Sequence, residues 1–458
     1  MKTLNLILSI TILLFSSNLI AQRGYSSGSV SMNRANKIVS SDQVIIEEYL
    51  NYHTHNITQP KNNEQIALSM EYRYMSNENL VLQVGIATKQ ILDYSNMPPI
   101  NISIVIDKSG SMQTGNRLGK VKNALSNLIK GLRADDYISI ITYSDDAKVL
   151  LETVKVGDIN NLINIIASIN PGGSTNLNDG LILGYKQVLK NYSPEMTNKV
   201  ILLTDGIANV GVTETEKIVK NSEFYNKKGI DVSTIGVGDN VNYSLLQQIA
   251  KKGKGANFFV GDAQEDISKA FDDELESLLS SIARNVSVEI EYPKELEIVN
   301  IFGYSPKYHG NKITIPLNNI NSGLTEVIIY EFKQTKSIKK PKINAKLIYS
   351  KGSTNKSNKI TQEITIDNDK YNFYNQEVLK NYYIATMAKS LKEMGQLISE
   401  DKNKEAVELI DKTIKQVNVQ FPQLKDKDLI RMKEVLVSNR QRLDYYYPRA
   451  DSYWGIIY

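Results

Sequence analysis

The feature that most constrains the fold of this chain is a series of short apolar segments that alternate with longer amphipathic ones between residues 99 and 280. The apolar segments are rich in branched residues and have few polar residues at their centres, which is typical of strands buried on both faces. They are INISIVID (100–107), YISIITY (137–143), KVILLTD (199–205) and IDVSTIGVG (230–238). The intervening segments have helical spacing, and they are GKVKNALSNLIKGL (119–132), TNLNDGLILGYKQVLKNY (175–192) and TETEKIVKNSEFYNKKG (213–229). This repetition predicts an α/β fold with a doubly wound, mainly parallel, Rossmann-like sheet over residues 99–281.

The segments on either side of this unit have other periodicities. Residues 43–98 contain two partly alternating stretches and predict an N-terminal β-rich region. Residues 282–370 return to a period of two and predict an antiparallel, sandwich-like domain. Residues 371–444 have the spacing of about three amphipathic helices. Residues 445–458 form an aromatic tail that we expect to pack on its own protein or to be loose, with docking onto a partner as the alternative.

The beginning of the chain predicts export. Residues 1–21 have Lys2, then an apolar stretch, then small and polar residues before Ala21, which is the form of a signal peptide cleaved after Ala21. An uncleaved membrane anchor is the alternative, because the stretch approaches the ~20 residues that a spanning helix needs. Residues 22–42 are rich in Ser, Gly and Asn and predict a flexible linker. We therefore expect a protein of the periplasm or outer cell envelope, or a secreted one, with no membrane span after signal cleavage.

Composition and charge narrow the classes of partner and ligand. Apolar residues make up 41% and charged residues 23% of the chain, which is usual for a folded, water-soluble protein. Lys and Arg number 54 against 50 Asp and Glu, a net charge of +4 spread along the chain, so we expect no nucleic-acid partner. There is no cysteine, which excludes disulfides and thiolate metal sites.

Two of the predicted strands end on a carboxylate. Ligands of open parallel sheets bind beyond the carboxyl ends of the strands, and Asp107 and Asp205 both lie at such ends. Ser109 and Ser111 follow the first, and Thr175 follows two glycines in PGGSTN (171–176). Taken singly, these residues fit turns and helix caps. Taken together, they are oxygen ligands suited to a hard cation, Mg²⁺ first, with Ca²⁺ or Mn²⁺ as alternatives. Because hydroxyls carry no charge, the bound ion would still attract one more anionic oxygen.

Three motifs carry a resemblance to a known family. DKSGSM, GGSTNLNDGL and LLTDGIANVG resemble the metal-ion-dependent adhesion site (MIDAS) of von Willebrand factor type A (vWA) domains, and the similarity spans about residues 99–280. The resemblance implies that Asp107, Ser109, Ser111, Thr175 and Asp205 form the metal site, some of them through water. It also implies metal-dependent binding of proteins rather than catalysis, in some members with movement of the last helix, here around residues 263–281. The flanking regions look like those of bacterial exported proteins with N-terminal and C-terminal domains around a vWA domain.

Two further pairs of side chains could bind a metal ion. His53 and His55 would point the same way on a strand, as zinc ligands can, but no third ligand is evident and we interpret them as ordinary polar residues. Asp145 and Asp146 fit a solvated turn better than the rim of the site or a second cation site.

Three functions are compatible with the sequence. The one we favour is an exported, non-enzymatic adhesion or interaction protein whose cation accepts an Asp or Glu carboxylate from a partner protein. The second is a structural or assembly protein of the cell envelope in which the metal only stiffens the fold. The third is a Mg²⁺-dependent hydrolase, for which no base is evident, since residues 56–308 contain no histidine.

Overall fold

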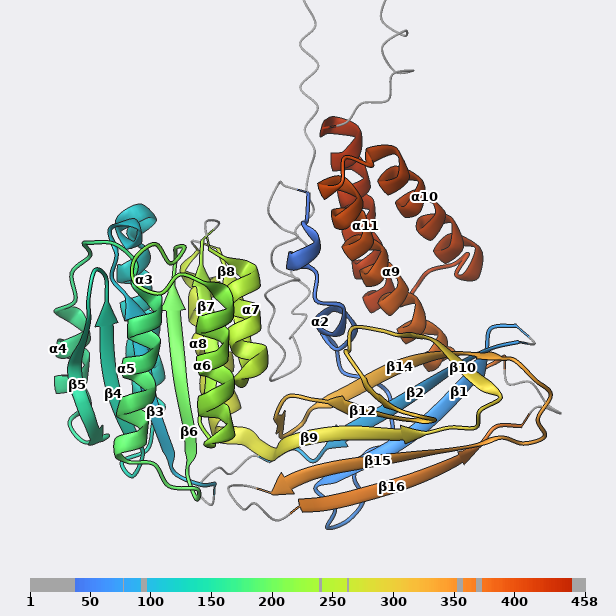
Figure 1. Cartoon of the computed structure of the whole chain (residues 1–458), viewed down its shortest axis with the longest axis horizontal. Helices are drawn as coiled ribbons and strands as arrows, with labels where there is room; N and C mark the ends of the chain where they lie inside the picture. Colours follow the sequence, from blue (N-terminus) through green and yellow to red (C-terminus); the bar gives the residue numbers. More distant parts are fainter. Residues whose placement is uncertain are drawn as a thin grey trace, which may run out of the picture.

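The computed structural model describes residues 38–446 apart from 77, 92–96, 239–240, 262, 352–356 and 368–372. The predicted signal peptide, most of the predicted linker and the tail from residue 447 lie outside these residues. The described chain forms an α/β domain, a β-sandwich and a helical region (Figure 1).

The α/β domain is built on one sheet with the strand order β5-β4-β3-β6-β7-β8. All neighbouring strands are parallel except β5, which runs antiparallel to β4. The central strands are buried along almost their whole length, in agreement with the expectation of a doubly wound, mainly parallel sheet. The strands are β3 (Ile100–Asp107), β4 (Tyr137–Tyr143), β5 (Ala147–Lys155), β6 (Thr197–Thr204), β7 (Asp231–Val237) and β8 (Lys254–Val260).

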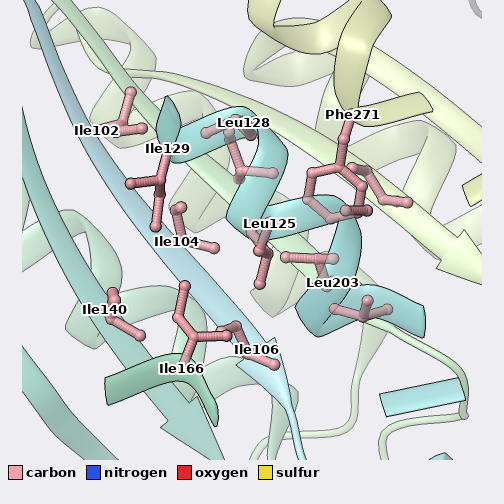
Figure 2. Packing of buried hydrophobic residues seen from close by; sticks show 14 of the residues in the cluster. Ile102, Ile104, Ile106, Leu125, Leu128, Ile129, Ile140, Ile166, Leu203 and Phe271 are labelled. Carbon is pink, nitrogen blue, oxygen red and sulfur yellow. The ribbon is translucent and has the colours of Figure 1, made fainter. Parts of the chain in front are cut away.

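Helices cover both faces of this sheet. One face packs against α3, α4 and α8, where Leu125, Ile166 and Phe271 meet the isoleucines of β3 (Figure 2). The other face packs against α5, α6 and α7 through a second apolar cluster. The helices are α3 (Arg117–Lys130), α4 (Ile159–Ala167), α5 (Leu177–Lys190), α6 (Thr215–Lys227), α7 (Tyr243–Lys252) and α8 (Gln264–Ser280), and a 3₁₀ segment, η2 (Gly110–Asn116), precedes α3.

The strand order reverses between β3 and β6. The chain leaves β3 toward β4 on one side and later returns to β6 on the other side. At such a switch point the connections diverge, and a crevice forms beyond the carboxyl ends of the two strands. Asp107 ends β3, and Asp205 directly follows β6, so the fold brings both predicted carboxylates to the switch point.

The sandwich combines strands from both sides of the α/β domain. One sheet has the order β1-β2-β14-β10, and the other β11-β12-β9-β15-β16 with β13 paired to β9. Their inner faces share one core cluster. The strands are β1 (Ile66–Tyr74), β2 (Asn79–Thr88), β9 (Ser281–Glu291), β10 (Leu296–Ile301), β11 (Lys307–His309), β12 (Lys312–Pro316), β13 (Ile320–Asn321), β14 (Thr325–Gln334), β15 (Lys342–Lys351) and β16 (Ser357–Thr365).

This arrangement changes the interpretation of the flanking regions. The periodicities of residues 43–98 and 282–370 predict separate units, whereas β2 pairs with β14 from Ala87↔Thr325 to Asn79↔Lys333. The α/β domain is therefore inserted into a single sandwich. Local periodicity cannot show this, because the pairing joins segments more than two hundred residues apart.

Polar contacts fix the α/β domain to the sandwich. Helix α8 ends at Ser280 and β9 begins at the next residue, with no intervening loop. At the start of β7, Asp231 accepts hydrogen bonds from Arg284 Nη2 of β9 at 2.9 Å and from Asn319 Nδ2 at 2.8 Å. Nearby, Lys254 Nζ donates to the carbonyl oxygen of Leu317 at 3.1 Å.

The helical region covers the outer face of the first sandwich sheet. Buried residues of α9 (Gln376–Ser399), α10 (Asn403–Gln420) and α11 (Lys427–Tyr446) form one cluster with the short helix α2 (Ile46–Leu50) and with β2 and β14. A 3₁₀ turn, η1 (Ser41–Gln43), precedes α2. Among the described residues, no helix combines the length and the apolar character needed to cross a membrane.

Candidate metal centre

The loop after β3 folds back around the side chain of Asp107. This carboxylate is fully buried; its Oδ1 accepts a hydrogen bond from the Ser109 backbone N–H at 2.8 Å, and its Oδ2 accepts one from Thr204 Oγ1 at 2.7 Å. Burial raises the pKa of Asp107 to about 6, and the hydrogen bonds from Ser109 and Thr204 oppose that rise. The carboxylate is thus held in one orientation by donors from two neighbouring strand ends.

A chain of oxygen atoms connects the two strand ends. Ser109 Oγ and Ser111 Oγ lie 3.0 Å apart, and Ser111 Oγ donates to Asp205 Oδ1 at 2.7 Å. Asp205 and Ser109 are buried, whereas Ser111 is exposed. The group therefore opens to solvent on the side of Ser111.

Thr175 joins this group through its own loop. The backbone N–H of Gly110 donates to the carbonyl oxygen of Gly173 at 3.0 Å, and that of Gly172 donates to the carbonyl oxygen of Lys108 at 2.7 Å, so the two loops are bonded side by side. A methyl group added at Gly206 would lie 3.6 Å from Thr175 Oγ1 and 3.8 Å from Ser111 Oγ. The structure thus brings all five predicted residues to one small region at the switch point.

Asp145 supports the Thr175 loop from outside. Its Oδ1 accepts a hydrogen bond from the Ser174 backbone N–H at 2.9 Å, and this bond lowers the pKa of the exposed carboxylate. Gly173 has φ +87°, and a Cβ there would come within 2.6 Å of Asp145 Oδ2. The glycine therefore allows both the left-handed backbone and the close approach of the carboxylate. The sequence favours a solvated turn at Asp145, and the structure adds this contact with the Thr175 loop.

A cation of the protein itself lies against Asp205. Arg117, the first residue of α3, is buried, and its Nη1 lies 3.0 Å from Asp205 Oδ2. Gly238, with φ +81°, lies against the guanidinium, where a Cβ would approach within 2.3 Å of Nη2. Neither Arg117 nor Thr204 was among the residues predicted from the sequence. The only local signal for Thr204 is its position directly before Asp205, and Arg117 gives none, because its partner is 88 residues away.

The donor set fits a hard divalent cation. It consists of two carboxylates and three hydroxyls, which suit Mg²⁺, Ca²⁺ or Mn²⁺ better than zinc. Nowhere in the described residues do three or more His, Cys, Asp or Glu side chains gather so that they could hold a metal ion. His53 and His55 are therefore not part of such a group. Both side chains are buried, and they lie next to Asp428 and Glu377 of the helical region.

These features define a class: an α/β domain with a doubly wound sheet and a group of carboxylate and hydroxyl oxygens at its switch point. Residues 101–273 match the family model of the von Willebrand factor type A domain. The chain therefore contains a vWA domain, as the three motifs indicated, and domains of this family are typical of protein–protein interaction and adhesion.

Relatives agree with this assignment. The chain is 29% identical to the protein YfbK of Escherichia coli over 262 residues, which cover 56% of this chain and 45% of that protein. It is 32% identical to inter-alpha-trypsin inhibitor heavy chain H3 of Homo sapiens over 230 residues, which cover 47% of this chain and 25% of that protein. The chain thus spans less than half the length of these relatives. The solved structure of a von Willebrand factor type A protein from Catenulispora acidiphila has a TM-score of 0.59, with 14% identity, 83% of this chain covered and 98% of that one.

Proposed function

We propose that this chain is an exported interaction protein that binds partner proteins through a divalent cation, Mg²⁺ in the first instance. The cation would be held by Asp107, Ser109, Ser111, Thr175 and Asp205, some of them through water. A carboxylate from an Asp or Glu of the partner would complete its coordination. The observation that carries the proposal is the continuous hydrogen-bonded link from Ser109 through Ser111 to Asp205, open to solvent at Ser111.

The composition of the site supports binding rather than catalysis. A metal-dependent hydrolase needs a positioned base or nucleophile beside its ion. Beside the candidate ligands, the Thr204 hydroxyl donates to Asp107 and the Arg117 guanidinium is paired with Asp205, so neither is placed to act as a base. Two carboxylates only balance a divalent ion, and one of them, Asp205, is also paired with Arg117, so an anionic oxygen from outside would be attracted.

A matched pair of serine variants tests the proposal. Ser111→Ala removes one hydroxyl from the site, and Ser126→Ala removes a hydroxyl that binds only the carbonyl oxygen of Lys122 within α3. Capture of partners from an envelope extract is compared with Mg²⁺ and with chelator for the wild type and both variants. We expect cation-dependent capture by the wild type and by Ser126→Ala but not by Ser111→Ala. The same partners with and without Mg²⁺ for the wild type would refute the proposal.

The two alternatives give different results in the same preparation. A purely structural metal predicts that chelator lowers the melting temperature while partner capture is unchanged. A hydrolase predicts Mg²⁺-dependent turnover of phosphate or carboxylate esters.

A further inference from the structure

The buried ion pair between Arg117 and Asp205 has a consequence for the charge of the cation site. Arg117 Nη1 lies 3.0 Å from Asp205 Oδ2, and both side chains are buried. The other oxygen of this carboxylate, Oδ1, accepts the hydrogen bond from Ser111. One carboxylate therefore faces a guanidinium with one oxygen and the candidate cation site with the other.

We propose that Arg117 is a positioning residue that sets the charge of the cation site by acting as a fixed counter-ion to Asp205. The inference rests on the proposed function, because it concerns the same cation. With Arg117 in place, the guanidinium offsets one of the two carboxylate charges. The site then holds a divalent cation less tightly than two free carboxylates would, because part of the Asp205 charge is already compensated.

The surroundings of Arg117 show that its position is fixed. Gly238, at φ +81°, leaves room for the guanidinium, since a Cβ there would meet its Nη2, Cζ and Nε atoms between 2.3 and 2.8 Å. A buried arginine stays protonated under all ordinary conditions, so its charge is a constant property of the site.

The experiment measures cation binding alone, by titration calorimetry with Mg²⁺ and by luminescence with Tb³⁺. Arg117→Met removes the charge and keeps an unbranched apolar side chain, while Arg117→Lys keeps the charge. Lys122→Met is the matched control, because it removes a cation from the same helix whose Nζ binds the carbonyl oxygen of Ala167 instead of a carboxylate. Circular dichroism establishes that each variant is folded.

We expect Arg117→Met to bind Mg²⁺ at least about tenfold more tightly than the wild type, because a positive charge close to the ion has been removed. The gain should be larger for Tb³⁺ than for Mg²⁺, since electrostatic repulsion scales with the charge of the ion. Arg117→Lys and Lys122→Met should stay close to the wild type. A purely structural role for Arg117 would not produce this dependence on ionic charge.

The possible results separate the inference from the proposed function. If the wild type binds Mg²⁺ and Arg117→Met binds it equally or more weakly, the inference is overturned and the proposed function stands. If neither protein binds either cation, both are overturned. If Arg117→Met alone binds, Arg117 does repel the cation as inferred, and the proposed role of Mg²⁺ in the wild type fails. If Arg117→Met does not fold, Arg117→Gln is measured in its place, and the same outcomes apply.

Discussion

The buried ion pair between β6 and α8 allows a quantitative test of how the vWA domain is held together. Lys199 Nζ lies 2.7 Å from Glu274 Oε1, and the two side chains are 8% and 0% exposed. Lys199→Met would leave the Glu274 carboxylate buried without its counter-ion. Breaking a buried pair in this way costs about 3–5 kcal/mol. For a domain of 150–250 residues, each kcal/mol lowers the melting temperature by about 2–4 °C, so a decrease of roughly 6–20 °C is expected.

The double variant Lys199→Met with Glu274→Leu distinguishes loss of pairing from loss of packing. Because both charges are removed, its stability should return to within about 1 kcal/mol of the wild type, or exceed it. A control pair exists in α6, where Lys227 and Glu223 are 3.0 Å apart but 73% and 42% exposed. Lys227→Met should leave the melting temperature close to that of the wild type, because exposed pairs contribute little.

Differential scanning calorimetry is the appropriate assay, since a chain with several domains need not unfold in one step. The transition that contains the vWA domain is the one that Mg²⁺ shifts if the cation binds there. Two results would refute this reasoning: a loss of less than about 1 kcal/mol for Lys199→Met, or a double variant as unstable as the single one. Either would show that Lys199 does not neutralise a buried Glu274 carboxylate.

Three further predictions concern other parts of the molecule. Burial lowers the pKa values of His53 and His55, so the folded state favours their neutral forms. Their contribution to the free energy of unfolding is complete above the unfolded pKa of about 6.5 and is lost as the pH falls below it. Urea unfolding should therefore show stability decreasing between about pH 6.5 and 5.5, because the two histidines outweigh the opposite contribution of Asp107, whose pKa is raised to about 6; a flat profile there would contradict this reasoning. Gly173→Ala should weaken Mg²⁺ binding in calorimetry, because a side chain at φ +87° costs about 1–2 kcal/mol and would collide with the carboxylate of Asp145; unchanged affinity would argue against the loop's role. Asp231→Ala should separate unfolding of the vWA domain from that of the sandwich in calorimetry, since it deprives Arg284 of its carboxylate across the interface, whereas a single shared transition would show that other contacts couple the two.

The sequence by itself determined the central part of the vWA sheet and the members of the candidate site. Strands β3, β4, β6 and β7 are buried on both faces, so each must be an uninterrupted apolar run, and that pattern is visible without a structure. Asp107 and Asp205 could be located from these strands, because they are the polar residues at which two buried apolar runs end. In a parallel sheet, that end of the strand is where ligands bind. The edges of the sheet were less evident: β5 alternates between half-buried and exposed residues, and it did not resemble the central strands.

The tertiary structure decided which distant segments meet. It placed β2 beside β14 and so inserted the vWA domain into one sandwich, and it set Arg117 against Asp205. The physical reason is the same in both cases. Local periodicity shows which face of a strand or helix is buried. Burying that face removes apolar surface from water whichever segment of the chain packs against it. The identity of the partner depends on pairing and on charge neutralisation across the whole fold, and these are properties of the assembled chain.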